Sequence, residues 1–101
     1  MRSLDYSSKI TIPESVLMQE LDGEAVLLHL DSGKYFGLDE VGTRMWQLLK
    51  SSASIQVAFE QILAEYEVEP GQLRTDLEDL IAELSEQKLI EVEAAETADN
   101  R

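Results

Sequence analysis

One stretch of the chain, residues 24–49, restricts the possible folds more than any other: EAVLLHLDSGKYFGLDEVGTRMWQLL. It reads as an apolar strand, a tight turn at Asp31–Gly33, a second strand over Lys34–Leu38 and the opening of an amphipathic helix. Glycine adopts the positive φ angle of such a turn without steric cost, so the strands are predicted to pair as a hairpin. Asp39 follows at once and is a good helix N-cap. A hairpin that leads directly into a helix leaves one edge of a small sheet beside helices.

A second hairpin precedes this stretch. Ser15–Leu21 is predicted to be a strand, and Asp22–Gly23 is a strong hairpin signal because it favours a type I′ turn. Glu24–Leu30 is apolar on both faces, as a central strand would be. The three strands are therefore predicted to form an antiparallel meander in chain order. The third strand, Lys34–Leu38, keeps one unpaired row of backbone N–H and C=O groups.

Three helices are predicted after the meander. The first runs from about Glu40 to Lys50, the second is capped by Ser54, and the third begins near Pro70, where the missing N–H of proline costs no hydrogen bond. The predicted fold is α+β and winged-helix-turn-helix-like, with a three-stranded antiparallel β-meander packed on three α-helices. Helical spacing along the third helix predicts an apolar stripe of Leu73, Leu77, Leu80, Ile81 and Leu84.

The two ends of the chain lack a clear period. Residues 1–9 are predicted to form a flexible N-terminal arm, followed by a short strand at Ile10–Ile12 that the next proline confines to an edge or an end. Leu89–Val92 is interpreted either as a short closing strand or as an extended packing segment. Residues 93–101 form a polar tail, which we predict to be disordered. The folded domain is thus predicted to span residues 10–92.

Charge limits the possible partners. The 101-residue chain has 8 Lys and Arg against 21 Asp and Glu, and its net charge of −13 repels nucleic acid and anionic membrane surfaces. Neutral or basic partners are favoured, although the same acidity also serves solubility alone. We find no cysteine, no signal peptide and no apolar run long enough to span a membrane, so we expect a soluble cytoplasmic protein.

The sequence contains no recognisable catalytic motif. His29 is the only histidine, and without a second histidine or a cysteine it is predicted to be structural or solvent-facing. Glycine-rich phosphate loops and zinc-binding spacings are missing. The many carboxylates match exposed helix faces. We therefore expect a binding protein without enzymatic activity, metal or cofactor.

Three binding modes remain open on these residues alone. In the first, an extended peptide adds to the free edge of Lys34–Leu38, with pockets between this strand and the third helix. Tyr35 and Phe36 would then face opposite sides of the sheet, unless both are core residues or Ile10–Ile12 covers the edge. In the second, the first-helix face near Trp46 binds a folded partner protein. In the third, the domain is a winged-helix regulator that binds DNA, which the acidic third helix disfavours.

Three pieces of this pattern resemble one known family. They are the aromatic-Gly-Leu-acid segment Tyr35–Asp39, the spacing from Gly42 to Trp46, and Leu73–Leu84. Over roughly Ile12–Val92 the chain is similar to the pyrroloquinoline quinone biosynthesis protein D (PqqD) family. These proteins are RiPP recognition elements, small winged-helix-like domains that bind leader peptides of ribosomally synthesised, post-translationally modified peptides. In this family the leader adds to the edge of the third strand and lays apolar side chains against the third helix.

The resemblance implies a binding site and a role. The domain would deliver the precursor peptide to a leader peptidase or another RiPP-modifying enzyme, and its stand-alone length is similar to that of domains in lasso-peptide clusters. Arg74 would pair with an acidic leader residue. Because an unpaired edge can pair with itself, a monomer and an edge-strand homodimer both remain open. The implied peptide contacts are Lys34, Tyr35, Phe36 and Leu38 on the strand, and Leu73, Arg74, Asp76, Leu77, Leu80 and Leu84 on the helix.

Overall fold

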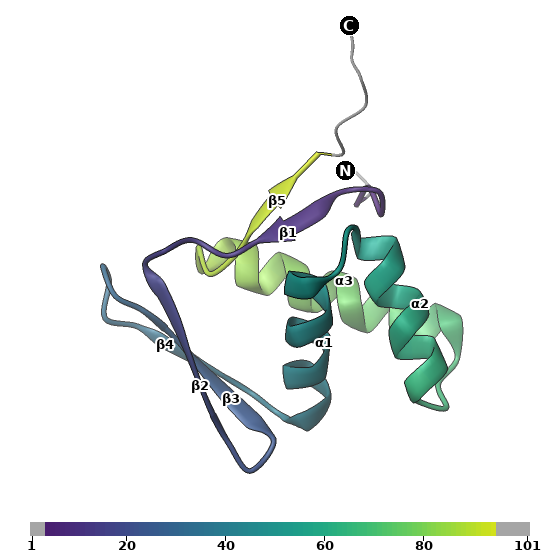
Figure 1. Cartoon of the computed structure of the whole chain (residues 1–101), viewed down its shortest axis with the longest axis horizontal. Helices are drawn as coiled ribbons and strands as arrows, with labels where there is room; N and C mark the ends of the chain where they lie inside the picture. The colour runs from purple at the N-terminus through teal and green to yellow at the C-terminus, as the bar shows by residue number, and fades with distance from the viewer. Residues whose placement is uncertain (1–3, 95–101) are drawn as a thin grey trace, which may run out of the picture.

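The computed structural model describes residues 4–94, and its elements follow the predicted order (Figure 1). The β2–β3–β4 meander lies on one side of the helices, and β1 and β5 lie together near the ends of the described chain (Figure 1). The predicted α+β fold is confirmed. None of the helices in this part of the chain is long and apolar enough to cross a membrane. The elements are β1 (Lys9–Thr11), β2 (Val16–Leu21), β3 (Glu24–His29), β4 (Tyr35–Leu38), α1 (Glu40–Ser51), α2 (Ile55–Glu65), α3 (Pro70–Glu86) and β5 (Glu91–Glu93).

The meander forms as its two turn sequences predict. β2 pairs antiparallel with β3, and β3 pairs antiparallel with β4, so β4 is an edge strand. In the first turn Asp22 and Gly23 have φ angles of 56° and 82°, and a type I′ turn requires positive values at both positions. In the second turn Gly33 has a φ of 74°, and its N–H donates to the His29 carbonyl at 2.8 Å. These turns set the register of the sheet.

The helix starts also match the sequence. The Asp39 carboxylate accepts a hydrogen bond from the Gly42 N–H at 2.8 Å, and the Ser54 hydroxyl accepts one from the Val57 N–H at 3.2 Å. Pro70 occupies the start of α3, which has no side-chain cap. The N-cap of α1, Asp39, is the residue directly after β4. The first turn of α1 therefore lies next to the end of the edge strand.

The N-terminal residues pack on the helices. The Ser8 carbonyl accepts a hydrogen bond from the Ile55 N–H at 2.8 Å, and the Ser8 side chain is buried. The Tyr6 hydroxyl donates to a carboxylate oxygen of Glu78 at 3.0 Å. These contacts include the segment in the folded domain and correct the flexible arm predicted over residues 1–9, of which the first three lie outside the described residues.

β1 pairs antiparallel with β5 in a separate two-stranded sheet. Ile10 lies opposite Val92 in this pair, and its side chain is buried in the core. The Ile10 segment therefore pairs with the C-terminal strand and leaves the β4 edge uncovered. Glu93 belongs to β5, whereas residues 95–101 of the predicted tail lie outside the described residues.

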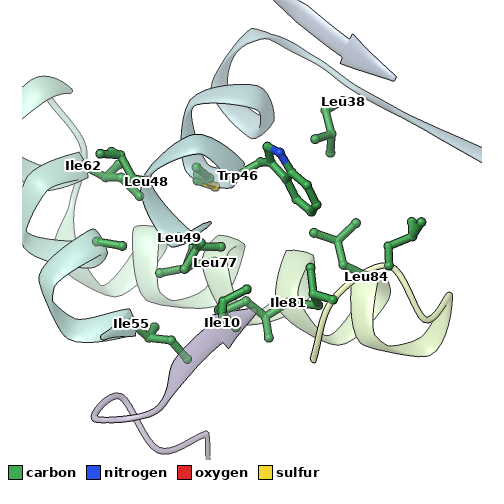
Figure 2. Close-up of a cluster of buried hydrophobic side chains, with 14 of the residues drawn as sticks. Ile10, Leu38, Trp46, Leu48, Leu49, Ile55, Ile62, Leu77, Ile81 and Leu84 are labelled. Atoms are coloured by element: carbon green, nitrogen blue, oxygen red, sulfur yellow. The ribbon is translucent and has the colours of Figure 1, made fainter. Parts of the chain in front are cut away.

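One hydrophobic core joins the three helices to the inner face of the meander (Figure 2). Figure 2 shows the Trp46 ring on the side of α1 that faces Leu38 and Leu84. Trp46 is only 1% exposed, so it connects the end of β4 with α3 from within. The Trp46 side chain itself therefore offers no contact to a folded partner, whereas binding of such a partner by the exposed face of α1 stays a prediction.

Candidate functional site

The outer edge of β4 offers backbone groups to a further strand. Opposed residues in an antiparallel pair alternate between hydrogen-bonded and non-hydrogen-bonded positions. The His29 N–H donates to the Lys34 carbonyl at 2.9 Å, which sets the phase of this alternation. The N–H and C=O groups of Tyr35 and Gly37 therefore face away from β3. Within residues 4–94 no strand pairs with this edge, so it is open to strand addition.

A groove opens where β4 ends, between α1 and α3, and has a volume of about 440 Å³. Its α3 residues are spaced i, i+3, i+4 and i+7, so they share one face of the helix. Apolar and acidic side chains thus line the same space, which we call the α1/α3 groove. The lining residues are Asp39, Val41, Gly42 and Met45 from the start of α1, and Asp76, Asp79, Leu80 and Glu83 from α3.

The β4 edge leads into this groove. At the start of β4, Phe36 meets Gln87 and Leu89 beyond the end of α3, around a space of only about 10 Å³. At the other end, Asp39 follows β4 and lines the groove beside the middle of α3. β4 and α3 therefore run in opposite directions.

A second hollow of about 220 Å³ adjoins the groove and shares Val41, Met45 and Asp76 with it. Its remaining walls come from α2, from the connection to α3 and from the first turn of α3. Most of these walls are apolar, so the hollow extends the groove toward the α2–α3 corner. They consist of Ile62, Tyr66, Glu67, Val68 and Leu73.

The groove carboxylates have few partners inside the protein. Asp39 caps its own helix, and Asp76 accepts a hydrogen bond from Gln72 Nε2 at 2.8 Å. The one ion pair within residues 4–94 lies elsewhere and joins Arg44 Nη2 to Glu65 Oε2 at 2.6 Å. Hydrogen bonds from Arg44, and then from a glutamine, lower the pKa of Glu65 to about 2. The negative charge of the groove therefore has no basic side chain paired with it in the described chain.

The predicted strand contacts lie on both faces of the sheet. Tyr35 is 75% exposed on the outer face, whereas Phe36 is half-buried on the helix side. The two aromatic residues thus lie on opposite faces, as strand alternation predicts. Lys34 is exposed just before β4, and Leu38 is a buried core residue.

The predicted leucines of α3 separate into two sets. Leu80 lines the groove together with Asp76, and Leu73 lines the adjoining hollow. Leu77 and Leu84 line neither space and are 0% exposed, because they point into the core beneath the groove. The structure therefore makes these two leucines supports of the groove instead of surface contacts.

Arg74 lies on the other flank of α3. Its guanidinium carbon is 4.9 Å from the ring centroid of Tyr6 and 5.5 Å from that of Phe59. Both distances fit cation–π contacts. The structure thus places Arg74 against the N-terminal segment and α2, away from the groove that the other predicted helix contacts surround.

Six residues that line the groove were not predicted as site residues: Asp39, Val41, Gly42, Met45, Asp79 and Glu83. Val41 and Met45 fall within the apolar stripe of α1, whose outermost members reach the surface beside α3. Asp79 and Glu83 lie three and seven residues after Asp76, and this spacing is a signal that could have identified them.

The outer face of the meander carries a separate apolar hollow of about 330 Å³. In the part of the chain that the structure describes, no helix covers this face, and Leu17 and Val26 are exposed there. Tyr35 connects it with the β4 edge. The sheet therefore buries one face only. The hollow is lined by Leu17, Met18, Gln19, Val26, Leu28 and Tyr35.

His29 has a local contact. Its Nδ1 accepts a hydrogen bond from the Ser32 N–H at 3.4 Å in the turn before β4. Across residues 4–94, no group of three or more His, Cys, Asp or Glu side chains is placed to hold a metal ion. The side chain of His29 thus bonds within its own turn, and the structural or solvent-facing role of this residue stays a prediction.

An open sheet edge that leads into a helical groove defines a class of small, winged-helix-like α+β domains. The chain belongs to one family of this class, because residues 24–90 match the family described as Coenzyme PQQ synthesis protein D (PqqD). The match covers β3, β4 and all three helices. A comparison with curated proteins gives no match.

Two solved structures are similar to this one. TbiB1 in complex with the TbiA(beta) leader peptide is 38% identical, with a TM-score of 0.75, over 88% of this chain and 99% of that chain. A lasso peptide synthetase B1 complexed with the leader peptide is 24% identical, with a TM-score of 0.74, over 82% of this chain and 98% of that chain. At its lower identity, the second structure supports the fold alone.

Proposed function

We propose that this domain is a RiPP recognition element that binds the leader peptide of a ribosomally synthesised precursor in lasso-peptide biosynthesis. The observation that carries the proposal is the open β4 edge, which leads into the α1/α3 groove. A leader that adds as a strand would satisfy the outward N–H and C=O groups of Tyr35 and Gly37. Its alternate side chains would face the helices. Backbone hydrogen bonds would then supply affinity, and side-chain contacts in the groove would supply specificity.

The proposed site combines the strand edge with the groove. Phe36 and Leu80 would contact apolar leader side chains from opposite sides, and Leu77 and Leu84 would hold α3 in position beneath them. Arg74 is left out because its guanidinium already contacts two aromatic rings on the other flank. Leu38 is also left out as a direct contact because its side chain lies in the core. The full set of proposed contacts is Lys34, Tyr35, Phe36, Val41, Met45, Leu73, Asp76, Asp79, Leu80 and Glu83.

Similarity to TbiB1 supports the choice of ligand. That protein is 38% identical to this chain along 99% of its own length, and its structure contains a leader peptide. Membership of the PqqD family supports the role of an adaptor without chemistry of its own. The domain would hold the precursor for a separate leader peptidase or another modifying enzyme.

Gly37 allows a test of backbone recognition. Gly37→Pro removes an outward N–H and leaves the hydrogen bonds to β3, since proline is tolerated where the N–H of an edge strand faces solvent. Gly37→Ala is the matched control, because a Cβ at this position meets no atom within 4 Å and the N–H is kept. We expect Gly37→Pro to weaken binding roughly tenfold or more, and Gly37→Ala to change it by less than about twofold.

The probes are two fluorescein-labelled synthetic peptides: the TbiA(beta) leader peptide and the leader of the precursor encoded beside the gene for this chain. Fluorescence anisotropy gives the Kd, and the emission of Trp46, which faces Leu38 at the end of β4, provides a label-free readout. Circular dichroism checks that both variants fold. The proposal is wrong if neither peptide binds saturably, or if the two substitutions have equal effects.

The same edge could pair with a second copy of the chain. A leader and a second copy would compete for the outward groups of Tyr35 and Gly37, so we propose that the leader-bound form is monomeric. Light scattering after size-exclusion chromatography, with and without peptide, tests this point. A dimer that persists when the peptide saturates the protein would contradict it.

A further inference from the structure

We infer that the bound peptide places a lysine or arginine side chain against Asp76, Asp79 and Glu83, beside an apolar side chain that rests on Met45 and Leu80. This inference rests on the proposed function, because the peptide must first lie along β4. It starts from the groove as a whole, whose lining combines apolar side chains with carboxylates, three of them on α3. Such a space suits a side chain with an apolar stem and a cationic head.

The spacing of the carboxylates fits an extended peptide. An α-helix rises about 1.5 Å per residue, so Asp76 and Glu83 are separated by roughly 10 Å along α3. An extended strand covers this length in about three residues, and its side chains on one face recur roughly every 7 Å. Two successive groove-facing positions, i and i+2, therefore span the acidic wall. One of them would be apolar and the other basic.

The electrostatics of the groove favour a cation from outside. Asp76 accepts a hydrogen bond from an amide, and within residues 4–94 no Lys or Arg forms an ion pair with Asp79 or Glu83. Like charges along one helix face repel, and a cation between them relieves this repulsion. A metal ion is the weaker alternative, because no group of three such ligands in the described chain is placed to hold one. A flexible basic side chain needs no such convergence.

The test neutralises the acidic wall. The double variant Asp79→Asn/Glu83→Gln keeps the shape of both side chains and raises the net charge by two. The matched control, Glu14→Gln/Glu60→Gln, makes the same change at exposed residues that line none of the hollows. Both are titrated with the two labelled leader peptides. We expect the groove variant to bind roughly 3- to 10-fold more weakly than wild type, and the control to stay within about twofold.

Salt and peptide variants identify the contact. Raising NaCl from roughly 50 to 500 mM should weaken binding to the wild type more than binding to the groove variant, because salt screens the removed attraction. Each Lys or Arg of the peptides is also replaced by norleucine, which keeps an apolar stem. One replacement should remove most of the difference between wild type and groove variant, as a double-mutant cycle requires for contacting groups.

The outcomes separate this inference from the proposed function. If Gly37→Pro weakens binding while the groove variant behaves like its control, the basic contact is wrong and leader addition to β4 stands. If the control weakens binding as much as the groove variant, the effect is one of overall charge, and the inference is also wrong. If Gly37→Pro has no effect beyond that of Gly37→Ala, the proposed function fails with it.

Discussion

The two flanks of α3 use their charged side chains differently. On one flank, Tyr6 contacts both Arg74, whose guanidinium carbon lies 4.9 Å from the ring centroid, and Glu78, which accepts the Tyr6 hydroxyl at 3.0 Å. On the other flank, Asp79 and Glu83 face the open α1/α3 groove. Within residues 4–94, the charged side chains of one flank thus have partners, whereas the carboxylates of the other flank have no basic partner.

This difference shows how a short helix can bind two chain segments. The covered flank is occupied by the turn at Asp5–Ser8 before β1, which combines backbone hydrogen bonds to α2 with one aromatic side chain on α3. The open flank offers the same kinds of contact: a row of backbone groups on β4, an apolar floor and charged side chains. We therefore regard the N-terminal segment as an internal example of the binding proposed for the leader.

The largest expected effect comes from the core that supports both flanks. Leu77 is 0% exposed, so Leu77→Ala should lower the free energy of unfolding by about 2–5 kcal/mol. Leu80 is half-buried at the groove, so Leu80→Ala should cost less than about 1.5 kcal/mol and mainly weaken peptide binding. Urea denaturation and peptide titration of both variants measure the two effects. Equal losses of stability would remove the distinction between support and contact.

A smaller effect is expected on the covered flank. Tyr6→Phe removes the hydrogen bond to Glu78 and should lower the free energy of unfolding by about 1 kcal/mol, since the phenol is partly buried. Leader affinity should stay unchanged, because the groove lies on the other side of α3. Tyr35→Phe is the control for stability, as Tyr35 is 75% exposed. A loss of leader binding in Tyr6→Phe would mean that the two flanks are coupled.

The same contact gives a dependence on pH. Burial, and then the hydrogen bond to Glu78, raise the pKa of Tyr6 from 10.0 to about 12. The folded state therefore favours the protonated phenol, so this contribution is fully present below about pH 10 and is lost as the pH rises toward about 12. Urea unfolding at about pH 9 and pH 11 should show a steeper loss of stability for wild type than for Tyr6→Phe. Parallel losses would contradict the raised pKa.

The fold could be predicted because its signals are local. The turns depend on glycines and an aspartate with positive φ angles, and α1 and α2 begin at side chains that accept a hydrogen bond from an N–H three residues later. Each of these structures is decided within a few residues. The order of strands and helices, and the free edge of β4, follow from them.

The sequence could not predict in the same way which residues of α3 face the core and which line the groove. An apolar stripe indicates which residues avoid water, but the rotation of the helix against α1 and β4 decides which of them reach the core. Leu77 and Leu84 therefore became core residues, whereas Leu80 lines the groove. The partner of Glu78 is Tyr6, 72 residues earlier, in a segment whose sequence has no period. Contacts at such separation leave no local pattern to read.

The smallest expected effect is a change in leader affinity on removal of the Gln72 side chain, which tests whether the carboxylates of the open flank are free to bind the leader. Gln72 Nε2 donates to Asp76 at 2.8 Å, an exposed i, i+4 pair that contributes only about 0.2–0.5 kcal/mol to stability. Gln72→Ala should free Asp76 for a basic leader side chain and tighten binding by up to about twofold, with stability nearly unchanged because alanine favours helix. Gln56→Ala is the matched control, since Gln56 makes the same kind of bond to Glu60 at 2.9 Å on α2, outside the groove. If Gln72→Ala weakens binding in the anisotropy titration, the amide itself contacts the leader, and the open flank is less purely acidic than we infer.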